Sequence, residues 1–230
     1  MQKKYKTHLF IMSPGRSGMN WIVDWLTKNP EINPQRNGSL LIPRISSLLE
    51  DEHLVKWEKK QKILKASRKF VNTLLRKSRY KYIINTSHHF NFIVRHSILK
   101  IFPTAKFIHL LRDGKCVIPS MVKRQKTTLQ NYINMWNEHA NKIITPDIPK
   151  QNLLIVKYES LVLDPTISRN ITRFLQINHH QDIIPWDRPI NTQHSNFYDS
   201  QNYWKSQKEL IEQMKQLNDN LDQLGYEKIE

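Results

Sequence analysis

The sequence predicts a single α/β domain whose central parallel sheet is flanked by helices. Short apolar runs with the composition of β-strands alternate with longer segments in which apolar residues recur at helical spacing. Strands that alternate with helices in this way form a parallel sheet with helices packed on both faces. A chain of 230 residues is long enough for one domain with a sizeable core, so we expect this domain to span residues 1–230.

The first strand, the loop after it and the first helix form the most informative stretch of the sequence. An apolar run from residue 8 ends at Pro14 and Gly15, and a helical pattern begins at Gly18. Such a turn forms an anion cradle, because backbone N–H groups point inward and the helix dipole adds partial positive charge. Arg16 adds a full positive charge. The two glycines alone also suit an ordinary strand–helix turn, so the interpretation depends on residues further along the chain.

This loop is not a Walker A motif. That motif places a Lys and a Ser or Thr directly after its last glycine, the Lys for the terminal phosphates and the hydroxyl for Mg²⁺. Here Met19 and Asn20 follow Gly18, so both groups are missing. We therefore expect the loop to hold a phosphate or sulfate without a metal ion.

Further strands and helices follow in alternation. Pro119 falls inside one predicted helix and should distort it. The basic residues of the long tract at 46–79 suit a solvated helix face better than a recognition surface. After the first strand and helix, we expect strands at residues 81–86, 106–111 and 153–158, and helices at residues 46–79, 92–102, 115–124, 127–144, 167–175 and 201–224.

Polar and charged side chains fall at the predicted strand ends. They are Arg16, Thr86, Arg112 and Tyr158, which are far apart in the sequence. Ligands of parallel α/β sheets bind at the carboxyl ends of the strands. We therefore expect these four residues to meet on one rim of the sheet.

The chain is strongly basic, with 36 Lys and Arg against 20 Asp and Glu and a formal net charge of +16. Such a charge attracts polyanions such as nucleic acid, acidic glycan or an anionic lipid surface. A small ligand with several charges needs only a few of these residues, and we consider that interpretation first. A single cysteine, Cys116, and the lack of a long apolar stretch or cleavage pattern predict a soluble cytoplasmic protein without a membrane span.

Three motifs together resemble the sulfotransferase family. They are the turn at residues 14–18, the pair Arg112 and Asp113 with Ser120 on the following helix, and the segment at residues 157–161. The resemblance extends in order over residues 8–175. It implies a P-loop NTPase-like sulfotransferase fold and an enzyme that moves a sulfuryl group from 3′-phosphoadenosine 5′-phosphosulfate (PAPS) to a hydroxyl or amine.

The resemblance also implies roles for individual residues. Arg16 would stabilise charge on the bridging oxygen of the donor, while Arg112 and Ser120 would grip its 3′-phosphate. Trp21 would pack on the adenine ring and Tyr158 would lie near the adenine edge. Backbone N–H groups for the 5′-phosphate would come from Ser17, Gly18, Met19 and Asn20.

The catalytic base is expected among His88 and His89, because imidazole titrates near neutral pH and both follow the second predicted strand. The sequence departs from the family around this position. Asn85 stands where the cytosolic branch has a Lys, and residues 36–38 lack the Glu that serves as base in the Golgi tyrosyl-protein branch. Met19 replaces a hydroxyl residue of the loop. No Cys/His spacing typical of a metal site occurs, so no metal is expected.

Three other functions stay open. An inactive nucleotide-binding relative would account for the departures at Met19 and Asn85. A basic protein that binds nucleic acid or another polyanion would account for the net charge, although no motif of a known nucleic-acid module occurs. A nucleotide kinase would need the missing Mg²⁺ ligand. We expect PAPS and its product adenosine 3′,5′-bisphosphate (PAP) as ligands, an acidic glycan or a small molecule as acceptor, and no dedicated nucleic-acid partner.

Overall fold

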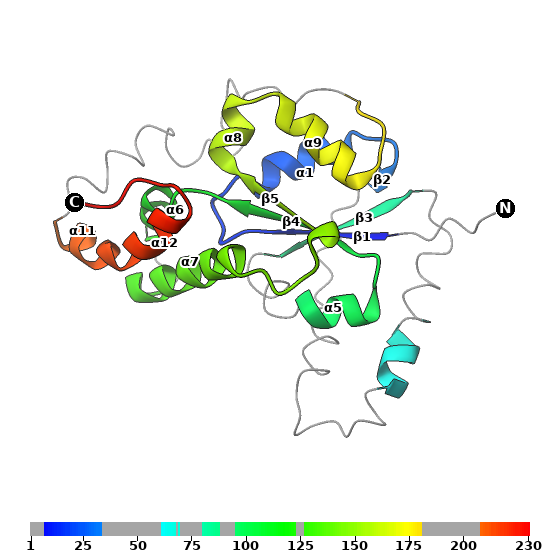
Figure 1. Cartoon of the computed structure of the whole chain (residues 1–230), viewed down its shortest axis with the longest axis horizontal. Helices are drawn as coiled ribbons and strands as arrows, with labels where there is room; N and C mark the ends of the chain where they lie inside the picture. The colour runs from blue at the N-terminus through cyan, green and yellow to red at the C-terminus, as the bar shows by residue number, and fades with distance from the viewer. Residues whose placement is uncertain are drawn as a thin grey trace.

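A computed structural model describes residues 7–33, 61–67, 69, 80–87, 95–122, 127–180 and 208–230. The chain folds around a five-stranded sheet with strand order β2-β3-β1-β4-β5 (Figure 1). Every pair of neighbouring strands is parallel. The predicted α/β class with a central parallel sheet and flanking helices is therefore confirmed.

Strand β1 lies at the centre of the sheet, and five of its six residues are buried. It pairs with β3 from Thr7 opposite Tyr82 to Met12 opposite Ser87, and with β4 on its other side. Buried apolar runs of this kind are typical of parallel strands that are covered on both faces. The strands are β1 (Thr7–Met12), β2 (Ile32–Asn33), β3 (Tyr82–Ser87), β4 (Lys106–Leu111) and β5 (Leu153–Lys157).

Helices connect the strands, and a last group of helices follows β5. Residues 61–67 are also helical. The helices are α1 (Met19–Thr27), α5 (Arg95–Ile101), α6 (Gly114–Val122), α7 (Leu129–Ile144), η1 (Lys150–Asn152), α8 (Tyr158–Leu163), α9 (Thr166–Leu175), α11 (Lys208–Met214), η2 (Lys215–Leu217) and α12 (Asn218–Gln223).

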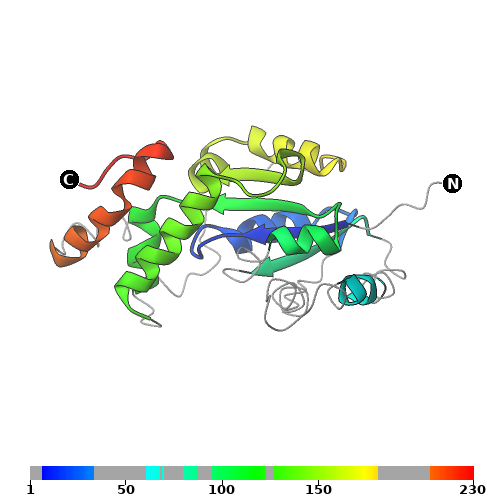
Figure 2. The ribbon, with the colours of Figure 1, turned by 60° about the horizontal axis from the view of Figure 1, so that its bottom comes forward.

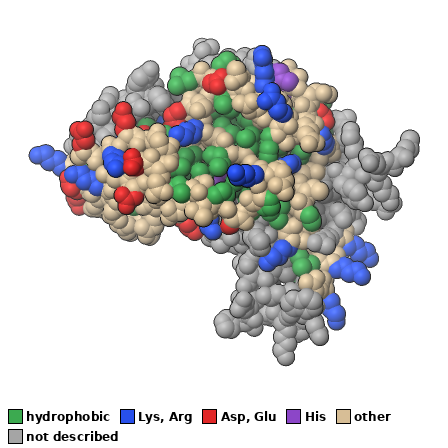
Figure 3. Space-filling model, in the orientation of Figure 1, with side chains coloured by type: hydrophobic (Ala, Val, Ile, Leu, Met, Phe, Trp, Pro, Cys, Tyr) green, Lys and Arg blue, Asp and Glu red, His purple; other side chains and the backbone are tan. Residues whose placement is uncertain are grey.

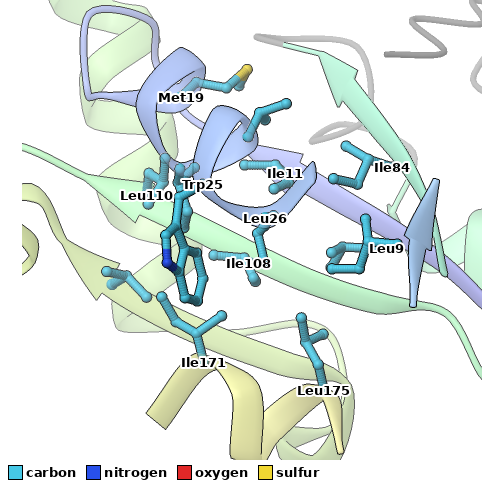
Figure 4. Packing of buried hydrophobic residues seen from close by; sticks show 14 of the residues in the cluster. Leu9, Ile11, Met19, Trp25, Leu26, Ile84, Ile108, Leu110, Ile171 and Leu175 are labelled. Atoms are coloured by element: carbon cyan, nitrogen blue, oxygen red, sulfur yellow. The ribbon is translucent and has the colours of Figure 1, made fainter. Parts of the chain in front are cut away.

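Alternation along the strands divides the core between the two faces of the sheet. On one face, Leu9 and Ile11 of β1 pack with Trp25 and Leu26 of α1, and α9 closes the layer through residues such as Ile171 (Figure 4). Helix α5 and residues 63–64 cover the opposite face. A third cluster joins the end of β4 to α6, α7, α11 and α12, which gather at one end of the molecule (Figure 2).

Several elements differ from the expected ones. Strand β3 extends one residue beyond Thr86, which lies opposite Ile11, and Tyr158 begins α8 rather than ending β5. The sequence did not predict β2 or η1, because elements of two or three residues carry too little periodicity. It also did not predict α8, because a helix of six residues covers less than two turns of the helical period. The predicted terminal helix contains a 3₁₀ turn at residues 215–217. Most of the tract at 46–79 lies outside the described residues.

No helix in the described part of the chain is long and apolar enough to cross a membrane. Among the described large apolar side chains, Ile155 of the edge strand β5 and Leu163 of α8 are exposed. Figure 3 shows apolar side chains in the middle of one face, with Lys and Arg scattered around them.

Candidate active site

The loop between β1 and α1, residues 13–18, is called the anion loop here. Three residues of its backbone have a positive φ, of 90° at Gly15, 53° at Arg16 and 81° at Gly18. A left-handed φ is uncommon for a residue with a side chain, so Arg16 is held in place by the surrounding structure. Consecutive N–H groups in such a loop can turn toward one anion.

Two buried serines brace the anion loop from within. The Ser13 hydroxyl accepts a hydrogen bond from the Gly15 N–H at 3.1 Å. The Ser17 hydroxyl donates to the Gly15 carbonyl oxygen at 3.0 Å. These bonds tie both serine side chains to the backbone of Gly15 and so stabilise the shape of the loop.

Gly18 is required because Tyr158 packs directly against it. A Cβ at Gly18 would lie 2.6 Å from Cδ2 of the Tyr158 ring, and the φ of +81° would add strain. Helix α1 begins at the next residue, and no described side chain caps its first turn. A helix N-terminus of this kind can direct backbone N–H groups toward an anion.

Three side chains from distant parts of the sequence meet beside the anion loop. Arg16 Nε donates to Ser120 Oγ at 2.8 Å, across 104 residues of sequence. Arg112 Nη1 donates to the Arg16 carbonyl oxygen at 2.9 Å. The Arg112 guanidinium lies over the Tyr158 ring, 4.5 Å from its centroid. Two guanidinium groups, a hydroxyl and a helix N-terminus thus occupy the carboxyl ends of β1 and β4, as expected of a site for a ligand with several negative charges.

The Asp113 carboxylate contacts the first turn of the helix that follows it, α6. Its Oδ1 accepts the Lys115 N–H at 2.8 Å at the start of α6, and its Oδ2 lies 3.6 Å from Lys115 Nζ. Burial raises the pKa of the Asp113 carboxyl, while the bonds from Lys115 oppose that shift. Asp113 therefore orders the turn from β4 into α6, next to Arg112.

The other residues predicted to bind the nucleotide differ in how far their side chains are buried. Trp21 belongs to the core and is 7% exposed, with its ring edge-on to Tyr158 at a centroid distance of 6.0 Å. The Met19 side chain is buried, whereas Asn20 is exposed. Stacking of Trp21 on adenine and the use of these backbone N–H groups stay predictions.

The two predicted base candidates, His88 and His89, lie outside the described residues. Asn85, which precedes them, is directed into the protein. Its Nδ2 lies 3.0 Å from His8 Nδ1 and donates to the Ile83 carbonyl oxygen at 3.1 Å. The Asn85 side chain therefore makes its hydrogen bonds within the sheet.

Sequence reasoning missed residues that hold the Arg112 turn. Trp136 of α7 donates its indole N–H to the Arg112 carbonyl oxygen at 3.0 Å, although its spacing indicated only an apolar position. Glu159 and Tyr226 also reach this turn, as described below. Glu159 was part of a recognised motif, whereas nothing in the sequence singled out Tyr226. Among the described residues no group of three His, Cys, Asp or Glu could hold a metal ion.

Comparison with known proteins places this chain in one family. The model of the sulfotransferase family matches residues 8–182. Protein-tyrosine sulfotransferase of Drosophila melanogaster is 33% identical over 104 residues, covering 38% of this chain and 21% of that protein. Protein-tyrosine sulfotransferase 1 of Danio rerio is 35% identical over 102 residues, covering 38% of this chain and 29% of that protein. This chain thus spans less than a third of either relative.

A solved structure extends the likeness to the whole fold. The sulfotransferase domain of the Synechococcus PCC 7002 olefin synthase superposes with a TM-score of 0.64, at 20% identity, over 99% of this chain and 98% of that domain. At this identity the likeness shows the fold. It agrees with the α/β fold described above.

Proposed function

Because the chain belongs to the sulfotransferase family, we propose that it transfers a sulfuryl group from PAPS to a hydroxyl or amine of an acceptor. The observation that carries this proposal is the cluster of Arg16, Ser120 and Arg112 beside the anion loop. Arg16 Nε lies 2.8 Å from Ser120 Oγ, and Arg112 Nη1 lies 2.9 Å from the Arg16 carbonyl oxygen. Two adjoining anion sites result, which suits a donor that carries a 5′-phosphosulfate and a 3′-phosphate.

The donor groups of the site fit these anions. The left-handed backbone at Gly15, Arg16 and Gly18 makes a loop that approaches a phosphate closely. Arg112 and Ser120 offer a planar guanidinium and a hydroxyl, which bind a phosphate through charge-assisted hydrogen bonds. We assign the loop to the 5′ end of the donor, and Arg112 and Ser120 to its 3′-phosphate.

PAPS, when bound, supplies the sulfuryl group and a phosphate leaving group. Arg16 stabilises the negative charge that grows on the leaving oxygen as the sulfur–oxygen bond breaks. His88 or His89 takes the proton of the acceptor, with His88 favoured because it lies nearer to the end of β3. The N–H groups of the anion loop orient the 5′-phosphate for in-line transfer.

The acceptor is proposed only as a class. The high net charge of +16 favours an acidic glycan, and a small hydroxyl compound needs only part of that charge. The matched fly and zebrafish relatives are named protein-tyrosine sulfotransferases, so peptide tyrosine is a third class to test. The same proposal includes a cytoplasmic location and no metal.

Isothermal titration calorimetry tests the donor. PAP should bind in the presence of a chelator, and ATP should bind much less well with or without Mg²⁺. Equal affinity for ATP, or a requirement for Mg²⁺, would contradict the proposal and favour a kinase. A transfer assay with ³⁵S-labelled PAPS against glycans, phenols and tyrosine peptides then identifies the acceptor; binding of PAP without transfer to any of them would favour the inactive relative.

A further inference from the structure

The C-terminal segment at residues 224–230 forms hydrogen bonds with residues next to the candidate site. The Tyr226 hydroxyl donates to Glu159 Oε2 at 2.9 Å. Lys157 Nζ donates to the Leu224 carbonyl oxygen at 2.6 Å and lies 4.6 Å from the centroid of the Tyr226 ring. The segment therefore contacts the junction of β5 and α8, which also carries Tyr158.

Glu159 links this segment to the turn after β4. While its Oε2 accepts from Tyr226, its Oε1 accepts the Asp113 N–H at 3.0 Å. That N–H belongs to the same peptide group as the Arg112 carbonyl, which accepts the Trp136 indole N–H at 3.0 Å. Both ends of one peptide group are thus held by side chains from two different helices.

This peptide group sets the direction in which the Arg112 side chain leaves the backbone. The guanidinium then lies over the Tyr158 ring and bonds to the Arg16 carbonyl oxygen. Tyr158 and Glu159 are neighbours in the first turn of α8, so one helical turn contacts both the side chain and the backbone of Arg112. Loss of either contact would allow the guanidinium to shift away from the anion loop.

We propose that Glu159 and Tyr226 are positioning residues for Arg112, so that the C-terminal segment takes part in the recognition of the donor's 3′-phosphate. The inference rests on the proposed function, because Arg112 is the residue assigned to that phosphate. Burial and the neighbouring Glu159 raise the pKa of the Tyr226 hydroxyl. The hydroxyl therefore stays protonated and donates to the carboxylate at neutral and alkaline pH.

The test compares Tyr226→Phe with a matched control, Tyr82→Phe. The Tyr82 hydroxyl donates to the Leu175 carbonyl oxygen at 2.7 Å and is buried at the other end of the sheet. Each variant loses one tyrosine hydrogen bond. Tyr226→Phe should lower the ratio of PAP affinity to AMP affinity about five- to tenfold, the scale of one such bond. Tyr82→Phe should leave that ratio unchanged. Its thermal midpoint should fall about as much as that of Tyr226→Phe.

A second variant and a second readout separate positioning from general stability. Glu159→Gln keeps an oxygen that can accept the Asp113 N–H, so it should retain most of the affinity ratio that Glu159→Ala loses. In NMR spectra without ligand, the Asp113 amide proton should move upfield in Glu159→Ala, because its hydrogen bond to the carboxylate is lost. It should also shift in Tyr226→Phe, because the carboxylate that accepts it loses the bond that fixes its position. The same signal should not move in Tyr82→Phe.

The outcomes distinguish the two proposals. If the wild-type chain does not prefer PAP over AMP, the proposed function fails, and the role of the segment in donor recognition fails with it. If the wild type prefers PAP and both Tyr226→Phe and Glu159→Ala keep that preference, only the positioning role is wrong. Equal losses of PAP and AMP binding would likewise overturn it, because the segment would then support the fold alone.

Discussion

Replacing Arg112 by Ala should remove recognition of the 3′-phosphate while leaving recognition of the 5′-phosphate largely intact. Arg112 makes two contacts that the substitution removes, a hydrogen bond from Nη1 to the Arg16 carbonyl oxygen at 2.9 Å and the packing of its guanidinium over Tyr158. Both contacts lie within the protein. The contact with the 3′-phosphate would be lost in addition, and only with ligands that carry this group.

These contacts predict two different losses of affinity. AMP has no 3′-phosphate, so its binding suffers only from the loosened anion loop, by about 1 kcal/mol or roughly fivefold, the scale of one hydrogen bond. PAP also loses the partner of a desolvated charge, which costs about 2–4 kcal/mol or about 30- to 700-fold. The preference of the protein for PAP over AMP should therefore nearly disappear in Arg112→Ala.

Calorimetric titration of both ligands into each variant measures this preference. Arg112→Lys should give an intermediate loss, since it keeps the charge without the planar fork of the guanidinium. Arg173→Ala is the matched control, because it removes one arginine from the exposed surface of α9 and should change neither affinity. Parallel losses of PAP and AMP in Arg112→Ala would refute the reasoning and make Arg112 a residue of the fold.

Three further predictions concern the reaction and the stability of the fold. Arg16→Ala should lower the turnover rate about 10²- to 10³-fold with a smaller effect on donor affinity, and Arg16→Lys should retain most of the rate. A loss confined to donor binding would contradict the role assigned to Arg16. His88→Ala or His89→Ala should flatten the acid side of the pH–rate profile at unchanged PAP affinity, and normal turnover in both variants would place the base elsewhere. Burial lowers the pKa of His8 from 6.5 to about 4. As the pH falls, the unfolded chain therefore takes up a proton before the folded chain does. The free energy of unfolding should fall by about 3 kcal/mol between pH 6.5 and pH 4. Urea unfolding at several pH values measures this loss, which His8→Gln should abolish if the buried imidazole is its cause.

Sequence reasoning works well for the parts of this protein that depend on local signals. The four main strands are apolar runs ended by turn residues, and their alternation with helices leaves only a parallel sheet. The anion loop was visible because Gly15 and Gly18 stand between a strand and a helix, where left-handed backbone is needed. Arg16 and Arg112 were placed at one rim because both directly follow or lie near the carboxyl end of a parallel strand.

Local signals in the sequence could not predict which way side chains point or which distant residues they contact. Trp136 has the spacing of a core residue, yet its indole N–H bonds to the Arg112 carbonyl oxygen. Asn85 stands at the position of a Lys in the cytosolic branch, and its amide lies 3.0 Å from His8 Nδ1 in the sheet interior. Each outcome depends on which way a side chain turns once its neighbours are packed.

The amino-acid sequence by itself determined the four main strands, the anion loop and the placement of the charged residues at one rim of the sheet, because these follow from apolar periodicity and glycine geometry within a few residues. Only the tertiary structure decided that Arg16 meets Ser120 across 104 residues and that Tyr226 reaches Glu159 across 67. Such contacts form when separate helices dock on the sheet, and their partners are chosen by the packing of the core rather than by any neighbour in the chain.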